Sequence, residues 1–383
     1  MPDLPTPPAR SAHGTPRWKK TVVDSYLRSE GVAVADVDGD GRLDIMAGNM
    51  WYRAPQPGNP TGTWTPHAIR PAEEFDGATG YSNSFINYAM DVNRDGWPDL
   101  IVIGFPAQKA VWLENPRGAP GPWREHTIWH SACNESPAFA DVDGDGEPEL
   151  VFAFDGSQMA WYKPGPDPYA PWSAYVISEP EAPGTQRYAH GLGVGDVNGD
   201  GRPDVLTRHG YWQSPPDPRL GPWKFIPADL GPDCAQMLVC DVNGDGLADV
   251  ITSSAHLKGI WWHEQVGGPQ GVRFTSHLID DTWSQSHGLV LADINGDGVP
   301  DLVTGKRFWA HGPTGDVEPD APAVLYWYEL RRDGDQVTWT RHLIDNDSGV
   351  GTQFQVVDIN GDGLLDVVTA NKKGVFLFEQ QPE

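Results

Sequence analysis

Two histidines, His190 and His287, each stand six residues before a short acidic loop, and Glu30 and Glu135 hold the same position before two other loops of this kind. Imidazole nitrogen and carboxylate oxygen are ligands that suit Zn²⁺ and similar divalent transition metals. Four such side chains at one position of a repeated unit predict a metal site if the fold gathers the units around one axis. The alternative is a set of separate polar residues that line a water-filled channel.

The acidic loops carry a second pattern of ligand types. Seven segments follow the order D-x-(D/N)-x-D-G-x-x-(D/E), and they begin at Asp36, Asp91, Asp141, Asp196, Asp241, Asp293 and Asp358. Oxygen-bearing side chains at alternate positions around a glycine suit a hard cation such as Ca²⁺. The glutamate that an EF-hand needs at its twelfth position is absent, so these loops are not EF-hands. A motif in every repeat indicates a scaffold role, either as calcium sites or as metal-free turns held by Asp side chains.

Five of the seven loops have the fullest set of oxygen ligands. Arg94 lies inside the second loop and Glu149 ends the third, so these two are weaker candidates. The predicted structural calcium ligands are Asp36, Asp38, Asp40, Asp44, Asp196, Asn198, Asp200, Asp204, Asp241, Asn243, Asp245, Asp249, Asp293, Asn295, Asp297, Asp301, Asp358, Asn360, Asp362 and Asp366.

The spacing of the loops predicts the fold that must position these residues. The loops recur every 45 to 65 residues, and each unit reads as four short strands, which is one blade of a β-propeller. Only two strands follow the last loop, and the segment 18–24 supplies the missing outer strand. We therefore predict an all-β, seven-bladed β-propeller with four-stranded blades, closed by the N-terminal strand. Residues 1–17 are an N-terminal extension and 18–383 form the propeller.

The repeated loops resemble the FG-GAP (VCBS-type) repeats of integrin-like β-propellers over nearly the whole chain. In addition, "HGLGVGDVNGDGRPDVLT", "SQSHGLVLADINGDG" and "TGKRFWAHGP…VLYWYEL" resemble the propeller domain of aldos-2-ulose dehydratase (1,5-anhydro-D-fructose dehydratase). That resemblance implies a sugar lyase whose propeller holds zinc in a cleft.

Composition limits the partners. The 383 residues include 27 basic and 53 acidic side chains, for a net charge of −26, which argues against nucleic acid or an anionic membrane surface. No apolar run is long enough to cross a membrane, and three cysteines without a CxxC spacing imply no disulfide framework. The first residues lack the apolar core of a signal peptide. The chain therefore reads as cytoplasmic, or as secreted or periplasmic if a signal was trimmed; the oligomeric state stays open.

Departures from the repeat mark candidate functional residues on the face opposite the acidic loops. The outer-strand residues His67, His126, His277 and His342 recur at one register and are predicted to pack. Candidates for acid, base or charge stabilisation are His209, Tyr188, His311, Arg208, Lys306 and Arg307. Candidates for binding a sugar by stacking and hydrogen bonding are Tyr81, Gln186, Arg187, Trp283, Gln285, His256 and Asn49.

These residues favour a carbon–oxygen lyase, a metal-dependent sugar dehydratase that performs β-elimination on a keto sugar at one central site. The predicted cofactors are Zn²⁺ or a similar divalent transition metal at His190, His287, Glu135 and Glu30, and Ca²⁺ in the acidic loops. The expected partner is a small sugar or oligosaccharide. The alternatives are a calcium-stabilised carbohydrate-binding lectin and an integrin-like interaction propeller without catalysis.

Overall fold

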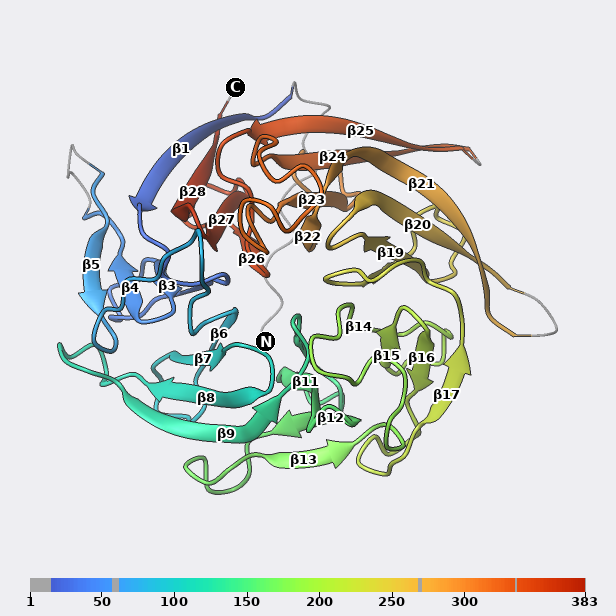
Figure 1. Ribbon diagram of the computed structural model, residues 1–383, viewed down its shortest axis with the longest axis horizontal. Helices are drawn as coiled ribbons and strands as arrows, with labels where there is room; N and C mark the ends of the chain where they lie inside the picture. The colour runs from blue at the N-terminus through green and yellow to red at the C-terminus, as the bar shows by residue number, and fades with distance from the viewer. Residues whose placement is uncertain (1–14, 57–61, 268–270, 335, 383) are drawn as a thin grey trace.

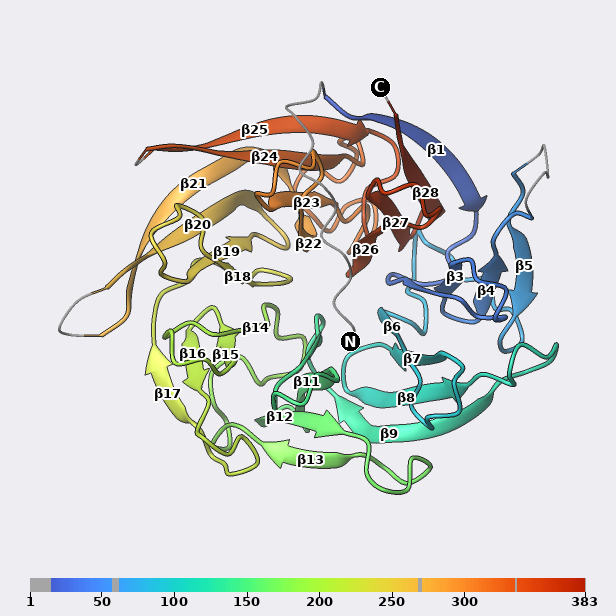
Figure 2. The ribbon, with the colours of Figure 1, turned by 180° about the vertical axis from the view of Figure 1, so that it is seen from behind.

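The computed structural model describes residues 15–56, 62–267, 271–334 and 336–382. Seven four-stranded antiparallel sheets form a ring around a central axis (Figures 1 and 2). The described residues contain strands but no helix, and so no helix long and apolar enough to span a membrane. The predicted all-β, seven-bladed propeller is confirmed.

The first three blades follow the chain order from the inner to the outer strand. Their strands are β2 (Ala33–Ala35), β3 (Asp44–Ala47), β4 (Met50–Arg53) and β5 (Thr65–Ala68); β6 (Ile86–Met90), β7 (Asp99–Ile103), β8 (Gln108–Glu114) and β9 (Arg124–Ala132); and β10 (Ala138–Ala140), β11 (Glu149–Phe154), β12 (Gln158–Lys163) and β13 (Ser173–Val176).

The next three blades repeat this order, and the seventh lacks an outer strand of its own. Their strands are β14 (Gly193–Gly195), β15 (Asp204–Thr207), β16 (Gly210–Gln213) and β17 (Lys224–Pro227); β18 (Leu238–Cys240), β19 (Asp249–Ser253), β20 (Lys258–Val266) and β21 (Arg273–Ser284); β22 (Ser286–Ala292), β23 (Asp301–Lys306), β24 (Leu325–Asp333) and β25 (Gln336–Asp345); and β26 (Phe354–Val357), β27 (Asp366–Asn371) and β28 (Gly374–Gln381).

The N-terminal strand β1 (Arg17–Asp24) completes the seventh blade, as predicted. It runs antiparallel to β28, with Trp18 opposite Gln380 and Val22 opposite Phe376. In Figure 1 the blue strand β1 lies beside the red strand β28. This pairing removes the open edge that β28 would otherwise present. Most of the predicted N-terminal extension, residues 1–14, lies outside the described residues, and Arg17 already belongs to β1.

Each acidic loop connects the first and second strands of its blade and is fixed by its own carboxylates. In the first loop the Asp36 carboxylate accepts the backbone N–H groups of Asp40 at 3.0 Å and Gly41 at 2.9 Å. Gly41 has φ of +84°, a conformation that glycine adopts without strain. The last carboxylate, Asp44, is buried and accepts N–H groups from Val37 and from Ala54 after β4. The motif therefore ties the loop to the third strand.

The outer strands pack by aromatic stacking. The imidazole of His126 on β9 stacks on Trp112 of β8 with ring centroids 4.3 Å apart, and His342 on β25 stacks on Trp327 of β24 in the same way. His67 and His277 stack on the equivalent tryptophans. These four histidines have the packing role that their register predicts.

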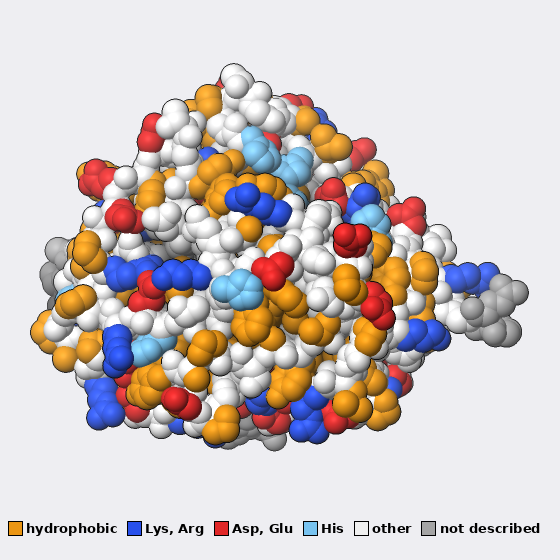
Figure 3. Space-filling view, turned by 60° about the horizontal axis from the view of Figure 1, so that its bottom comes forward, with side chains coloured by type: hydrophobic (Ala, Val, Ile, Leu, Met, Phe, Trp, Pro, Cys, Tyr) orange, Lys and Arg blue, Asp and Glu red, His pale blue; other side chains and the backbone are white. Residues whose placement is uncertain are grey.

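On the face shown in Figure 3, acidic, basic and hydrophobic side chains are interspersed.

Cys133 and Cys234 are buried and Cys240 is partly buried, and none forms a disulfide. The absence of a disulfide framework is as the sequence predicts.

Ring closure by β1 gives a first prediction. Deletion of residues 1–24 removes β1 and exposes the edge of β28, so we expect the melting temperature to fall by about 10 °C or more, because each kcal/mol lost shifts a large domain by roughly 2–4 °C. Deletion of residues 1–14 keeps β1 and is the control. Thermal melting of both truncations checks this, and equal melting temperatures would contradict a closing role for β1.

Candidate functional site

Glu30, Glu135 and His287, each six positions before an acidic loop, contact the buried guanidinium of Arg307, which directly follows β23. Its Nε and Nη2 donate to Glu30 Oε2 at 2.8 and 2.6 Å. Its Nη1 donates to Glu135 and lies 3.1 Å from His287 Nε2. Glu30, Glu135 and His287 come from the first, third and sixth blades, so the cluster lies where inner strands converge. We call Glu30, Glu135, His190, His287 and Arg307 the axial cluster.

His190, from the lead-in to β14, joins the axial cluster through Glu135. Its Nε2 lies 2.8 Å from Glu135 Oε2, and its ring centroid is 5.7 Å from that of His287. One ligand atom from each of Glu135, His190 and His287 falls within 4.8 Å of the others. This spacing and this donor set suit a divalent transition metal.

The charges in the axial cluster favour the ligand forms of two residues. Burial and the nearby Arg307 cation lower the pKa of His287 well below its usual range, which keeps this imidazole neutral. Burial acts to raise the pKa of Glu135, but Arg307 and the hydrogen bond from His190 outweigh it and hold that pKa well below its usual range. Neutral imidazole and ionised carboxylate are the forms that bind metals.

A second group of ligand types adjoins the axial cluster. His256, in the turn between β19 and β20, places Nε2 3.1 Å from His190 Nε2. His311 and Asp316 lie in the long connection between β23 and β24, where His311 Nδ1 is 2.7 Å from Asp316 Oδ1. This hydrogen bond raises the pKa of His311, and it helps to lower the pKa of the nearly buried Asp316 against the effect of burial.

Aromatic rings lie beside the axial cluster. Phe85 lies under the Arg307 guanidinium, 5.4 Å from it, and packs against Tyr81 and Phe105. Tyr188 is 44% exposed and contacts Phe105. Arg187 stacks on Tyr188 with its guanidinium 4.6 Å from the ring centroid. Exposed rings next to buried polar groups suit the C–H faces and hydroxyls of a sugar.

Of the other predicted site residues, Arg208, Lys306 and Trp283 have partners outside the axial cluster. Arg208 forms an ion pair with Asp233, and Lys306 Nζ donates to Ser284 Oγ and to the carbonyl of Glu318. Trp283 donates Nε1–H to the Tyr328 hydroxyl and packs against a hydrophobic cluster. The remaining three are Gln186, exposed; His209, partly exposed at the β15–β16 turn; and Gln285, buried with its amide on the Val317 carbonyl. Their predicted roles stay predictions.

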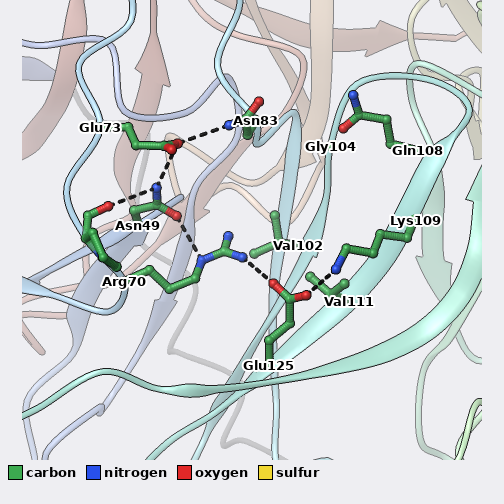
Figure 4. A pocket seen from close by; sticks show the side chains of 11 residues that line it. Asn49, Arg70, Glu73, Asn83, Val102, Gly104, Gln108, Lys109, Val111 and Glu125 are labelled. Atoms are coloured by element: carbon green, nitrogen blue, oxygen red, sulfur yellow. Dashed lines mark hydrogen bonds and ion pairs between the residues drawn. The ribbon is translucent and has the colours of Figure 1, made fainter.

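Asn49 lies in a groove between the first and second blades. Figure 4 shows its side chain between Glu73 and Arg70, and Arg70 continues to Glu125 at 2.6 Å. The cavity has a volume of about 390 Å³ and shares no lining residue with the axial cluster. The charged groups Arg70, Lys109 and Glu125 of this groove pair with one another. Because the groove shares no residue with the axial cluster, Asn49 does not belong to the central site that the sequence predicts.

The acidic loops differ in how their carboxylates are neutralised. Two loops bring three carboxylates within 4.8 Å of one another, those of Asp36, Asp38 and Asp40 and those of Asp141, Asp143 and Glu149. Each set contacts a basic side chain: Arg53 pairs with the first set, and Lys163 Nζ lies 2.8 Å from Asp143 and 3.1 Å from Glu149. Lys163 therefore occupies a position suited to a cation.

The loops 241–249, 293–301 and 358–366 form no ion pair with a Lys or Arg side chain among the described residues. In the loop at 293, Asn295 Nδ2 donates to Asp297, and burial raises the pKa of Asp301 to about 7. The Arg332 guanidinium donates to the carbonyls of Asp241 and Val242 in the first of these loops. The loops at 293 and 358 are therefore the ones in which Ca²⁺ would meet no competing basic group among the described residues.

Sequence reasoning missed two residues of the site. Asp316 lies in the insertion that makes the sixth unit the longest, and that insertion was its only signal. Lys372, in the β27–β28 turn, places Nζ 4.3 Å from the Tyr81 ring centroid, and burial lowers its pKa. No spacing in the sequence connects Lys372 with Tyr81.

The blades and their loops define the class of protein. The signature of the FG-GAP-like repeat matches residues 91–152, 141–207 and 241–304, and that of the FG-GAP repeat matches residues 30–63. The chain is therefore a seven-bladed β-propeller that carries FG-GAP repeats, as the sequence motifs predict. These matches do not bear on the resemblance to aldos-2-ulose dehydratase.

The relatives are integrins. The chain is 29% identical to human (Homo sapiens) integrin alpha-IIb and 27% identical to mouse (Mus musculus) integrin alpha-IIb, with matches that cover 40% of this chain. The chain spans about a fifth of the length of these curated relatives, since the matches cover 19% of each integrin.

Among solved structures, BBS1N in complex with ARL6DN has a TM-score of 0.53 and 11% identity, covering 96% of this chain and 97% of that chain. A lectin of Agrocybe aegerita that recognises non-reducing terminal N-acetylglucosamine has a TM-score of 0.37 and 19% identity, covering 94% and 80%. The likeness to BBS1N shows the fold alone.

The buried ion pairs of the axial cluster give a second prediction. Arg307→Leu leaves the Glu30 and Glu135 carboxylates buried without their cation, so we expect a loss of about 3–5 kcal/mol in the free energy of unfolding. Arg331→Leu is the control, because Arg331 pairs with Glu329 but its own side chain is 66% exposed, so it does not neutralise a carboxylate from a buried position as Arg307 does. Urea unfolding measures both variants; similar midpoints for the two would contradict a stabilising role for Arg307.

The ammonium of Lys163 gives a third prediction. In Lys163→Ala the carboxylates of Asp143 and Glu149 lose their internal cation, so we expect the chain to bind one additional Ca²⁺. Calcium calorimetry on chelator-treated protein measures the stoichiometry. Lys224→Ala, at an exposed position on β17, is the control. An unchanged calcium count in Lys163→Ala would show that this loop is only a turn.

Proposed function

We propose that the protein is a metal-dependent carbohydrate lyase that removes water from an oxidised sugar by β-elimination at the axial cluster. The observation that carries this proposal is the meeting of Glu135, His190 and His287 within 4.8 Å of one another, beside the exposed imidazole of His311. A ring of similar blades has no packing need for these residues, because the equivalent positions in other blades hold Phe85 and Ala235.

The donor set fits a divalent transition metal. His287 Nδ1 is buried and has no hydrogen-bond partner among the described residues, which leaves a buried ring nitrogen open to a bound group. Glu135, His190 and His287 are the candidate ligands; Glu30 is hydrogen-bonded twice by Arg307, which favours a role in holding that guanidinium. When bound, such a metal polarises a carbonyl and makes the neighbouring C–H more acidic.

The residues around the cluster can carry the proton transfers. His311 donates Nδ1–H to Asp316, which leaves the Nε2 lone pair as a base for the C–H proton next to the carbonyl. The C–H electrons form the new C=C bond as the β-hydroxyl leaves, and the hydroxyl takes a proton from an acid such as Tyr188 to depart as water. The ammonium of Lys372, near Tyr81, favours the negative charge that develops on oxygen.

Aromatic rings and Arg187 supply the sugar-binding side. Tyr81, Phe105 and Tyr188 form a continuous set of ring contacts next to the cluster. The Arg187 Nε–H donates to the Pro106 carbonyl, which holds the guanidinium against Tyr188. Gln186 precedes Arg187 in the same exposed segment, where its amide could bind hydroxyls.

The fourth prediction tests the reaction. Zinc-loaded protein incubated with a panel of keto sugars should generate ultraviolet absorbance from a conjugated enone. His311→Ala should lower kcat by about 100-fold or more, as for loss of a general base. Activity of the unchanged protein should rise with pH through the raised pKa of His311, because only the neutral imidazole accepts a proton.

His130→Ala is the matched control. His130 pairs with Asp155 at 2.9 Å as His311 does with Asp316, but it is exposed and outside the axial cluster. Equal rates for His311→Ala and the unchanged protein would remove His311 from the mechanism. Sugar binding without turnover across the panel would overturn the lyase proposal in favour of a lectin.

A further inference from the structure

The groove that contains Asn49 lies between the first and second blades, and we call it the interblade groove (Figure 4). Its volume of about 390 Å³ is within the range of roughly 300–1,000 Å³ that small-ligand sites occupy. The first blade lines it with the β3–β4 turn and the segment after β5. The second blade lines it with the segment before β6 and with residues of β7, β8 and β9. The groove is therefore built by two blades that only the ring brings together.

The charged side chains of the interblade groove are unevenly paired. Arg70 Nη1 is 2.6 Å from Glu125 Oε2, and Lys109 pairs with Glu125 as well, so two cations share one carboxylate. The Glu73 carboxylate forms no ion pair with a described residue and accepts hydrogen bonds from two asparagine amides. The lining as a whole has no net charge. One end of the groove nevertheless has an excess of positive charge, and the other has an excess of negative charge.

A single amide group connects the two ends. Asn49 Nδ2 lies 3.4 Å from Glu73 Oε2, and Asn49 Oδ1 accepts a hydrogen bond from Arg70 Nε at 3.0 Å, as Figure 4 shows. A ligand that contacts both ends needs a cation and an anion that are close together. An α-amino acid has its ammonium and its carboxylate on one carbon atom, which is the shortest arrangement of this kind.

The positive end has hydrogen-bond donors to spare. The Arg70 side chain uses two of its five N–H donors, on Asn49 and Glu125, and Lys109 uses one of its three on Glu125. The remaining donors can bind the carboxylate of a ligand without breaking these contacts. Hydrogen bonds between ionised groups are stronger than neutral ones, so they would orient the ligand in the groove.

The base of the interblade groove is aliphatic. Val102 on β7 pairs with Val111 on β8, and both side chains are buried. None of the described residues that line the groove is aromatic, so a sugar ring would find no stacking face there. An aliphatic side chain that packs on the two valines would instead be removed from water.

We propose that the interblade groove binds one free amino acid with an aliphatic side chain. Glu73 accepts hydrogen bonds from the ammonium of the ligand, and Arg70 and Lys109 donate to its carboxylate. The aliphatic side chain packs on Val102 and Val111. A zwitterion complements a lining that has no net charge but opposite charges at its two ends. The groove shares no lining residue with the axial cluster, so this inference is independent of the proposed lyase reaction.

Calorimetry with L-leucine tests the class of ligand. We expect one L-leucine to bind per chain, and glycine to bind about tenfold or more weakly, because glycine has no side chain to pack on the valines. Two derivatives each remove one charge: N-acetyl-L-leucine lacks the ammonium, and L-leucinamide lacks the carboxylate. Each derivative should bind about tenfold or more weakly than L-leucine.

Two variants assign the two ends of the ligand. Glu73→Gln should weaken L-leucine binding by about tenfold and leave that of N-acetyl-L-leucine unchanged, because this derivative has no ammonium. Lys109→Gln should weaken L-leucine and N-acetyl-L-leucine binding several-fold but leave L-leucinamide binding unchanged. Both positions are exposed, so the variants should fold, and circular dichroism melting checks this. Glu74→Gln is the matched control, since Glu74 is exposed and does not line the groove.

Three outcomes would overturn the proposal. Failure of L-leucine and the other standard amino acids to bind at millimolar concentrations would mean that the groove is only a space between blades. Equal affinities of L-leucine and its two derivatives would mean that the charges of the groove do not select the ligand. Binding of a neutral monosaccharide that is lost in Glu73→Gln and kept in Glu74→Gln would assign the groove to a sugar.

Discussion

Closure of the ring is the constraint on which the rest of the structure depends. β1 pairs with β28, and the first blade then follows the seventh without an open edge. Only in a closed ring do the lead-ins of seven inner strands point to one axis. Glu30 of the first blade and Thr352 of the seventh are then neighbours, with the Thr352 backbone N–H donating to the Glu30 carbonyl at 2.7 Å.

Closure of the ring also buries two carboxylates near the axis, and the axial cluster pairs them with a cation. Glu30 and Glu135 are carboxylates that burial would penalise, and Arg307 gives both a cation within hydrogen-bonding distance. The guanidinium is planar and has five donors, so it can serve two carboxylates and the His287 ring at once. The scaffold thereby keeps two charged side chains on the axis of a protein whose net charge is −26.

The protein uses histidine in two different ways. His67, His126, His277 and His342 repeat at one register, stack on tryptophan, and belong to the fold. His190, His256 and His287 do not repeat in every blade, and the His190 ring contacts the other two. Repetition and its absence separated the two sets in the sequence, because a residue that every blade needs for packing must recur.

The sequence by itself determined the number of blades, the strand that closes the ring and the acidic loops, because each depends on a local pattern that recurs. The same register predicted that Glu135, His190 and His287 converge. Only the tertiary structure decided the partners of these residues: Arg307 is 277 residues from Glu30 and 172 from Glu135. Asp316 reaches His256 from a non-repeating insertion, and Lys163 and Arg53 reach the acidic loops from the third strands. Long side chains and irregular connections have no period, so their contacts are set by packing of the whole ring.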